Sequence, residues 1–284
     1  MFLGALVSRA HHASFGGITA TLQASSFESL ADRTVRILDA TTISEPGSTG
    51  TDWRLHYSLR LPEMKCDFFE LTDAKGGESV RRPPIHEGDI FLLDRGYNDR
   101  KAIAGVLRTK ADVVLRWHSQ AFPLMDGQGR AFPLLSKIRK LRIGEIGEYA
   151  AWFKHGTESL PMRVCVLRKS NEAALRSERK ARHKARSSKT VRPQTIELTQ
   201  YLVVLTSLPA AVITSRVVLE CYRARWQVAL AFKRLKSLLE LGQLPKKKAA
   251  SSIAWMQGKI FCALMIERIL CEARSLSPWG YRLR

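Results

Sequence analysis

A continuous apolar run, Ile90–Leu93, limits the fold of this chain more than any other feature. It lies between a polar loop and Asp94, and its four residues suit a short strand that is buried on both faces. Such a strand needs covering elements on both sides of its sheet, which favours a layered fold of helices and strands.

The other apolar patterns predict strands and helices around this run. Strands are predicted where apolar residues alternate with polar ones or end at turn residues, at 34–38, 55–61, 68–71, 112–117 and 201–205. Helices are predicted at 99–108, with Asn98 as the cap, at 214–241 and at 251–273. This order of elements predicts an α/β fold with a mixed sheet.

The charge of the chain points to a polyanionic partner. The sequence has 46 Lys and Arg against 26 Asp and Glu, a formal net charge of +20. Its apolar runs are short compared with the roughly 20 residues that span a bilayer, so no membrane segment is expected. Five cysteines without a C-x-x-C pair favour a reducing compartment over a disulfide framework or a zinc site. On charge alone, ribosomal or non-specific RNA binding is as well supported as DNA binding.

Asp39 and Asp94 each follow an apolar run that is predicted to be a strand. In open α/β sheets, side chains that contact ligands gather at such strand ends. A single aspartate there is most often a turn residue or a helix cap, whereas two of them favour a functional site. Adjacent carboxylates repel each other unless a cation lies between them, and a hard divalent ion such as Mg²⁺ suits that arrangement.

The predicted helix 214–241 has an apolar face and a basic face. Its expected buried stripe consists of four apolar residues, Val228, Phe232, Leu235 and Leu239. The neighbouring face surrounds a small residue, Ala229, with one aromatic ring and three cations, which are Tyr222, Arg225, Lys233 and Lys236. A solvent-exposed basic face would explain the cations, but it would not explain the aromatic ring aligned with them.

Three segments of the chain together resemble the signature blocks of IS4-type DDE transposases. They are Asp-Ala-Thr-Thr at 39–42, Asp-Arg-Gly-Tyr at 94–97, and the block at 222–237 that contains Tyr222, Arg225 and Lys236. The resemblance covers residues 35–236. It implies an RNase H-like α/β fold, in which helices flank a mixed sheet and a β-rich insertion subdomain follows the second aspartate.

The resemblance also implies how the chain is divided. The expected parts are a short leader (1–30), the first half of the catalytic domain (31–117), the β-rich insertion with a basic helical stretch (118–193), the second half of the catalytic domain with the long helix (194–245), and a C-terminal helical segment (246–284). Only 38 residues precede Asp39 and 48 follow Lys236. Family members normally carry more at both ends, so a truncated, decayed or engineered copy is expected, and the sequence does not separate these three.

The resemblance assigns roles to individual residues. Asp39 and Asp94 would bind Mg²⁺ or Mn²⁺, which supports cutting and strand transfer at transposon ends. The DNA-binding set would comprise Tyr222, Arg225, Trp226, Lys233, Lys236 and Arg95, with Trp226 packing beside a base. The implied partners are double-stranded DNA, as transposon ends and target, and a second copy of the chain. The implied location is the bacterial cytoplasm, in association with the nucleoid.

One departure from the family pattern bears on catalysis. The third carboxylate of the family falls at position 229, where this chain has alanine. On an ideal helix Glu240 lies about 16 Å farther along the axis, and Glu220 lies on the opposite face, so neither replaces it. The sequence therefore predicts a DNA-binding chain with impaired catalysis.

Three functions remain open at this point: a DDE transposase, a non-catalytic DNA-binding remnant of one, and an unrelated basic RNA-binding protein. Other chemistry lacks its motifs, because the sequence has no phosphate-binding loop of the G-x-x-x-x-G-K-[ST] type, no H-E-x-x-H and no G-x-S-x-G.

Overall fold

The computed structural model describes residues 30–185, 192–242, 244–245 and 249–275. The chain forms two compact units, which are described in turn. The first unit combines residues 1–78 with 224–284, and the second consists of residues 79–223. The expected leader at 1–30 lies almost entirely outside the described residues.

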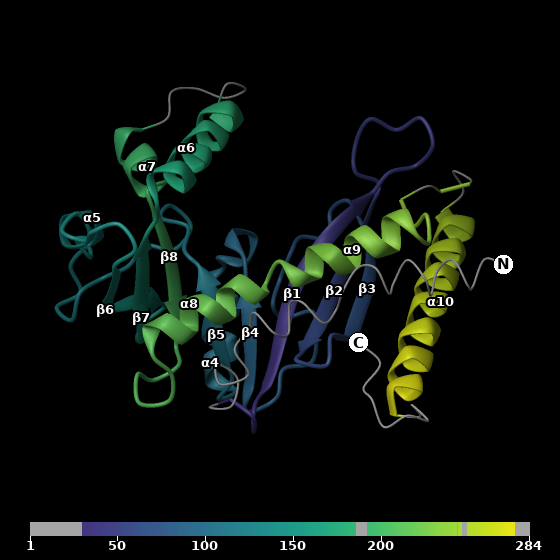
Figure 1. Cartoon of the computed structure of the whole chain (residues 1–284), viewed down its shortest axis with the longest axis horizontal. Helices are drawn as coiled ribbons and strands as arrows, with labels where there is room; N and C mark the ends of the chain where they lie inside the picture. The colour runs from purple at the N-terminus through teal and green to yellow at the C-terminus, as the bar shows by residue number, and fades with distance from the viewer. Residues whose placement is uncertain (1–29, 186–191, 243, 246–248, 276–284) are drawn as a thin grey trace. The chain divides into compact units, whose positions relative to one another are not determined.

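The first unit is built on three antiparallel strands, β1 (Thr34–Ile43), β2 (Trp53–Leu61) and β3 (Lys65–Asp73). Helix α9 (Gln227–Ser237) crosses one face of these strands, and α10 (Ala249–Ser275) follows it in the chain (Figure 1). The ring of Phe232 on α9 meets the ring of Tyr57 on β2 edge to face, with centroids 5.8 Å apart. Aromatic and aliphatic side chains on these facing surfaces form the core of the unit.

Strand β1 is longer than the sequence indicated, and this corrects the predicted place of Asp39. The strand was expected to end at Leu38, but it continues to Ile43, so Asp39 lies inside it opposite Tyr57. The β-branched pair Thr41 and Thr42 extends the strand, because antiparallel pairing with β2 supplies hydrogen bonds along this whole stretch. Of the two aspartates, only Asp94 follows the end of a strand.

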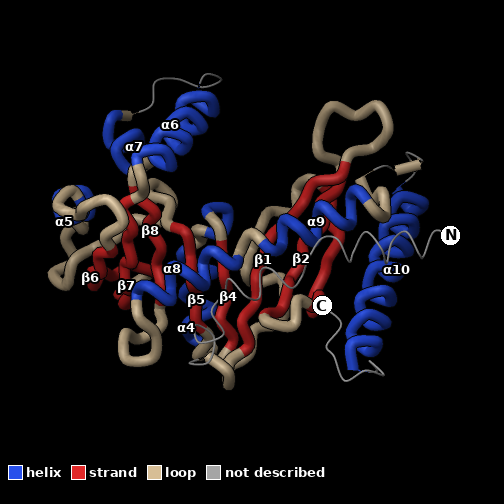
Figure 2. Tube along the Cα trace, viewed as in Figure 1, coloured by secondary structure: helices blue, strands red, loops and turns tan. Residues whose placement is uncertain are grey.

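The second unit holds five strands in the order β4-β5-β8-β7-β6 (Figure 2). Strands β4 (Asp89–Leu93) and β5 (Asp112–Arg116) are parallel and are joined through α4 (Arg100–Arg108). Strand β8 (Tyr201–Thr206) pairs antiparallel with β5 and with β7 (Glu158–Arg168). Every residue of Ile90–Leu93 is fully buried, which confirms the buried strand predicted from that apolar run.

The expected β-rich region contains a long antiparallel hairpin formed by β6 (Ile146–His155) and β7. Short α5 (Leu134–Ile138) precedes the hairpin in the chain, and α6 (Asn171–Ala185) and α7 (Pro193–Leu198) follow it. Helix α6 carries the basic stretch that the sequence indicated as helical.

The predicted helix 214–241 is two helices, α8 (Ser215–Ala224) and α9, and this corrects the sequence prediction. No proline or glycine separates them. The hydrogen bonds at the junction instead join residues three apart, from the Val228 amide to the Arg225 carbonyl (3.4 Å) and from the Ala229 amide to the Trp226 carbonyl (3.0 Å). This tighter pattern keeps Trp226 near helical torsion angles (φ −64°, ψ −14°), but it interrupts the hydrogen bonds between residues four apart that define a regular α-helix.

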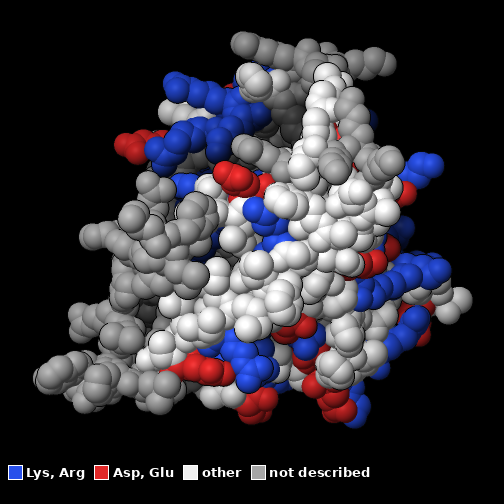
Figure 3. Space-filling view, turned by 90° about the vertical axis from the view of Figure 1, so that its right-hand side faces the viewer, with Lys and Arg blue, Asp and Glu red and all other residues white. Residues whose placement is uncertain are grey.

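Helix α10 leaves an apolar face exposed. Its exposed large side chains are Trp255, Phe261, Met265 and Ile269, while Met256 and Ile260 are buried. Figure 3 looks onto the side of the first unit where uncharged surface lies between groups of charged side chains. By length and composition, residues 249–270 could cross a membrane, which the sequence analysis did not expect. One such helix is weak evidence for a membrane protein, because core helices of other proteins pass the same test.

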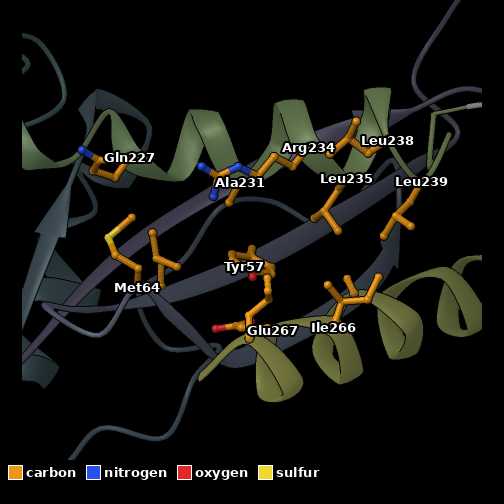
Figure 4. A pocket seen from close by; sticks show the side chains of 13 residues that line it. Tyr57, Met64, Gln227, Ala231, Arg234, Leu235, Leu238, Leu239, Ile266 and Glu267 are labelled. Carbon is orange, nitrogen blue, oxygen red and sulfur yellow. The ribbon is translucent and has the colours of Figure 1, made fainter. Parts of the chain in front are cut away.

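The core of the first unit contains a cavity of about 160 Å³ between β2, α9 and α10. Most of its lining is aliphatic, but Tyr57, Arg234 and Glu267 also border it (Figure 4). Burial raises the pKa of the Glu267 carboxyl, which also accepts a hydrogen bond from the Cys66 amide (3.0 Å).

Candidate catalytic and nucleic-acid site

Asp39, in the middle of β1, forms an ion pair with Arg225. The guanidinium Nη1 of Arg225 donates to Oδ2 of Asp39 at 3.0 Å, and the two side chains are 23% and 20% exposed. The other carboxylate oxygen, Oδ1, accepts from the amide of Ala40 at 2.9 Å. Arg225 lies at the junction of α8 and α9. The regular helical hydrogen bonding therefore ends where the chain contacts Asp39 on β1.

Lys236 reaches the same strand from the last turn of α9. Its Nζ donates to the carbonyl oxygen of Thr42 at 2.7 Å, and burial lowers its pKa. The first unit thus brings together two residues of the predicted DNA-binding set and the strand that carries Asp39. Within this unit both cations contact β1 directly.

The other sequence-predicted residues of α9 and its junction face solvent. Trp226 is 44% exposed, and Ala229 and Lys233 are also exposed. Tyr222 differs, because it belongs to α8 and is only 7% exposed. The prediction of one continuous helix at 214–241 placed Tyr222 on the exposed basic face. Because the hydrogen-bonding pattern changes between α8 and α9, residues of the two helices do not share one continuous face, and that prediction is wrong for Tyr222.

In the second unit, Asp94 directly follows β4 and caps a short 3₁₀ helix, η1 (Arg95–Tyr97). Its Oδ1 accepts from the Gly96 amide at 2.6 Å, while its own backbone is extended (φ −90°, ψ −169°). This is the position after a buried strand that the sequence indicated. Arg95 is exposed, whereas Tyr97 is buried.

Asn98 anchors the Asp94 loop, a role that the sequence analysis missed. Its buried amide Nδ2 donates to the carbonyl oxygens of Asp94 (3.4 Å), Arg95 (3.2 Å) and Arg116 (2.8 Å). Its Oδ1 accepts from the amide of His118 at 3.0 Å. Asn98 was predicted to cap the next helix, but Asp99 caps α4 by accepting from the Lys101 amide at 2.9 Å. Asn98 instead ties the loop to the end of β5.

Arg95, Arg116 and Lys169 form a group of interacting cations in the second unit. Although Arg95 is exposed as a residue, partial desolvation of its guanidinium lowers its pKa, and the positive charge of Arg116 lowers it further. Burial, followed by the charges of Arg116 and Arg95, lowers the pKa of Lys169 to about 8. The Nε of Arg116 is buried, and no residue in the described part of the chain accepts its hydrogen bond. A group of like charges with an unused donor suits an anion.

No sequence motif pointed to Arg116 and Lys169, because they lie far apart in the chain. The one available signal for Arg116 was its position at the end of the apolar run of β5. No local sequence pattern indicated a role for Lys169. Its Nζ donates hydrogen bonds to Ser177 Oγ (2.9 Å) and to the Thr199 carbonyl oxygen (2.8 Å).

The residues present fit a divalent metal ion only in part. Asp39 and Asp94 offer oxygen ligands of the kind that Mg²⁺ and Mn²⁺ prefer, but position 229 offers none. In the part of the chain that the structure describes, no three His, Cys, Asp or Glu side chains form a group able to hold a metal ion. The donor set is therefore one carboxylate short of the family pattern.

Comparison with known proteins identifies the family. A family model described as "Transposase DDE domain" matches residues 70–266. The chain is 31% identical over 251 residues to the putative transposase InsL of insertion sequence element IS186A from Escherichia coli K12, and to the transposase of element IS421 from Escherichia coli. Each alignment covers 86% of this chain and 68% of the relative.

A solved structure supports the same fold. The piggyBac transposase, determined as a synaptic complex with hairpin DNA, superposes with a TM-score of 0.50 over 82% of this chain and 46% of that one, at 9% identity. This likeness and the mixed pairing of strands with flanking helices confirm the predicted RNase H-like α/β class. The chain belongs to the DDE transposases of insertion sequences, a family that catalyses DNA cleavage and strand transfer.

Proposed function

We propose that this chain binds double-stranded DNA as an IS4-type transposase does, and that its ability to cut DNA is impaired. The observation that carries the proposal is the state of Asp39, which is paired with Arg225 while position 229 lacks a carboxylate. A carboxylate neutralised by a guanidinium is a poorer metal ligand than one held beside another carboxylate. In intact family members the divalent ions activate the attacking oxygen and stabilise the leaving oxygen.

The proposed DNA contacts combine predicted and newly observed cations. Arg95, with Arg116 and Lys169, would hold one phosphate, because an anion among three cations relieves their mutual repulsion, which together with burial lowers the pKa of Lys169. Exposed Lys233 and Trp226 would contact the DNA beside Ala229. Arg225 and Lys236 would reach phosphates after leaving their contacts on β1. The predicted phosphate contact of Tyr222 would require its side chain, which is buried in α8, to become accessible.

The transposon end and the target are the proposed DNA partners, and a second copy of the chain is the proposed protein partner. The proposed location is the bacterial cytoplasm, at the nucleoid. Membership of the transposase family leaves RNA binding without independent support. A DNA-binding chain that does not cut would occupy transposon ends and inhibit intact copies of the element.

Restoring the missing carboxylate tests the proposal. The variant Ala229→Glu is expected to nick DNA that carries the ends of the encoding element in the presence of Mg²⁺ or Mn²⁺. The wild-type chain is expected to bind the same DNA without nicking it above background. Ala229→Gln is the matched control, because it adds a side chain of the same size without a charge, and position 229 is exposed enough to accept either.

A second control addresses the aspartates. Adding Asp94→Asn to Ala229→Glu is expected to abolish the recovered nicking. If the wild-type chain cuts as well as Ala229→Glu does, impaired catalysis and the assignment of position 229 are both wrong.

A further inference from the structure

A polar cavity in the second unit lies beside the Asp94 loop. Its volume is about 440 Å³, and its lining comes from three places: the segment 98–101 at the start of α4, Ala121, and the segment 154–156 at the end of β6. Residues that are distant in sequence thus form one hollow, which none of the sequence motifs indicated. Its volume is within the range of small-ligand pockets, about 300–1,000 Å³.

Half of the eight residues that line this cavity are basic. Arg100, Lys101 and Lys154 contribute three cations, and His155 adds an imidazole. The single acid of the lining, Asp99, already accepts a hydrogen bond from the amide of Lys101. A cavity with this surplus of exposed donors and positive charge selects an anion.

The two sides of the cavity are held together. Nη1 of Arg100 donates to the carbonyl oxygen of Lys154 at 3.1 Å, which links the start of α4 to the end of β6. A guanidinium has five N–H donors, so this bond leaves most of its hydrogen-bonding capacity for a ligand. The guanidinium of Arg100 is therefore positioned before an anion arrives, which reduces the entropic cost of binding it.

Asn98 connects this cavity to the candidate catalytic loop. It lines the cavity, and its amide also binds the carbonyl oxygens of Asp94 and Arg116. A ligand in the cavity thus lies at a fixed place relative to the Asp94 loop. A DNA strand that passes this loop would place a further phosphate in the cavity.

We infer that this cavity, lined by Arg100, Lys101, Lys154 and His155, is a second phosphate-binding site that holds the DNA backbone beside the cleavage position. The inference rests on the proposed DNA binding and adds a contact outside the family's three blocks. The phosphate can belong to the transposon end or to the target DNA, which share the same backbone chemistry.

The test uses the full-length chain and the salt dependence of DNA binding. Removing two cations with Lys101→Ala/Lys154→Ala is expected to weaken binding and to reduce the slope of log Kd against log salt concentration by about one to two. The charge-matched control is Lys140→Ala/Arg142→Ala, which removes two exposed cations of the same unit outside the cavity and should leave the slope unchanged. Circular dichroism and thermal melting confirm that both variants are folded.

Two fluorescently labelled duplexes of equal length distinguish the sources of the phosphate. One carries the end sequence of the encoding element and the other has a random sequence. A reduced slope only on the end duplex assigns the site to the transposon end, and a reduced slope on both assigns it to any DNA backbone, including the target. If the wild type binds both duplexes and the cavity variant keeps the wild-type slope on each, the inference is overturned. If the wild type binds neither duplex, the proposed function itself fails.

Discussion

The Asp39–Arg225 pair is the clearest individual contact in the candidate site. Each side chain is about one-fifth exposed, which places the pair between a solvated surface pair and a buried one. Surface pairs contribute about 0–1 kcal/mol, and pairs with less solvent contribute more because water screens them less. The same contact competes with any cation or phosphate that approaches either residue.

A double-mutant cycle with Asp39→Asn and Arg225→Gln measures this contact. We expect a coupling energy of about 1 kcal/mol from urea unfolding of the wild type, both single variants and the double variant. The exposed pair of Lys110 and Glu87 is the control, and its cycle with Lys110→Gln and Glu87→Gln should give a value near zero. Equal coupling in the two cycles would show that the Asp39 pair is no stronger than a surface pair.

Lys169 predicts a pH dependence of stability. Its pKa is about 8 in the folded chain and near its ordinary value of 10.5 in the unfolded chain. Between these two pH values the unfolded chain binds more protons, so the contribution of Lys169 to the free energy of unfolding rises with pH. Below pH 8 Lys169 is protonated in both the folded and the unfolded chain. The free-energy cost of burying its positive charge is therefore fully present there, and it does not change with pH.

Comparison with Lys169→Met isolates this contribution from other titrating groups. The stability of the wild type relative to the variant is expected to increase from pH 8 to pH 10 in urea unfolding, and to stay constant from pH 6 to pH 7. A difference that is flat from pH 8 to pH 10 would contradict a lowered pKa for Lys169.

At the scale of elements, the cavity behind α9 limits how firmly that helix is held. A gap of about 160 Å³ forfeits contacts that neighbouring aliphatic side chains could make. Ala231 borders the gap and has a small side chain, so it is the place where volume can be added. Because α9 carries Lys236 and Ala229, its packing affects the site directly.

Filling the gap with Ala231→Leu is expected to stabilise the chain by about 1 kcal/mol, seen as a higher melting temperature. The control Ala254→Leu adds the same side chain at an exposed position of α10 and should change stability little. A lower melting temperature for Ala231→Leu would mean that the gap cannot accept the side chain without strain.

At the scale of the whole molecule, the net charge of +20 gives the chain a general attraction for polyanions. This attraction provides affinity without sequence preference and weakens steeply as salt increases. Preference for particular DNA requires contacts with the bases, because phosphate contacts fix the position of the backbone and do not read its sequence. Removing matched charges therefore separates the contribution of placed cations from that of total charge.

Much of the fold could be predicted because it is recorded locally in the sequence. The run Ile90–Leu93 is apolar throughout, so it identified a buried strand, and the basic helix at α6 and the strand β8 followed from composition and alternation. The three motif blocks indicated the family, because each is a short run of neighbouring residues that can be read directly from the sequence. Asp94 was correctly placed after a buried strand for the same reason.

Other features depend on contacts between distant segments. Pairing with β2 decided that β1 continues through Asp39, and tertiary packing of α8 decided that Tyr222 is buried. Arg95, Arg116 and Lys169 come from three separate parts of the chain, and their mutual repulsion exists only once the strands are assembled. By itself the sequence determined the buried strands, the charge and the family. The tertiary structure alone decided which charges meet, because packing and pairing act between residues that local patterns cannot relate.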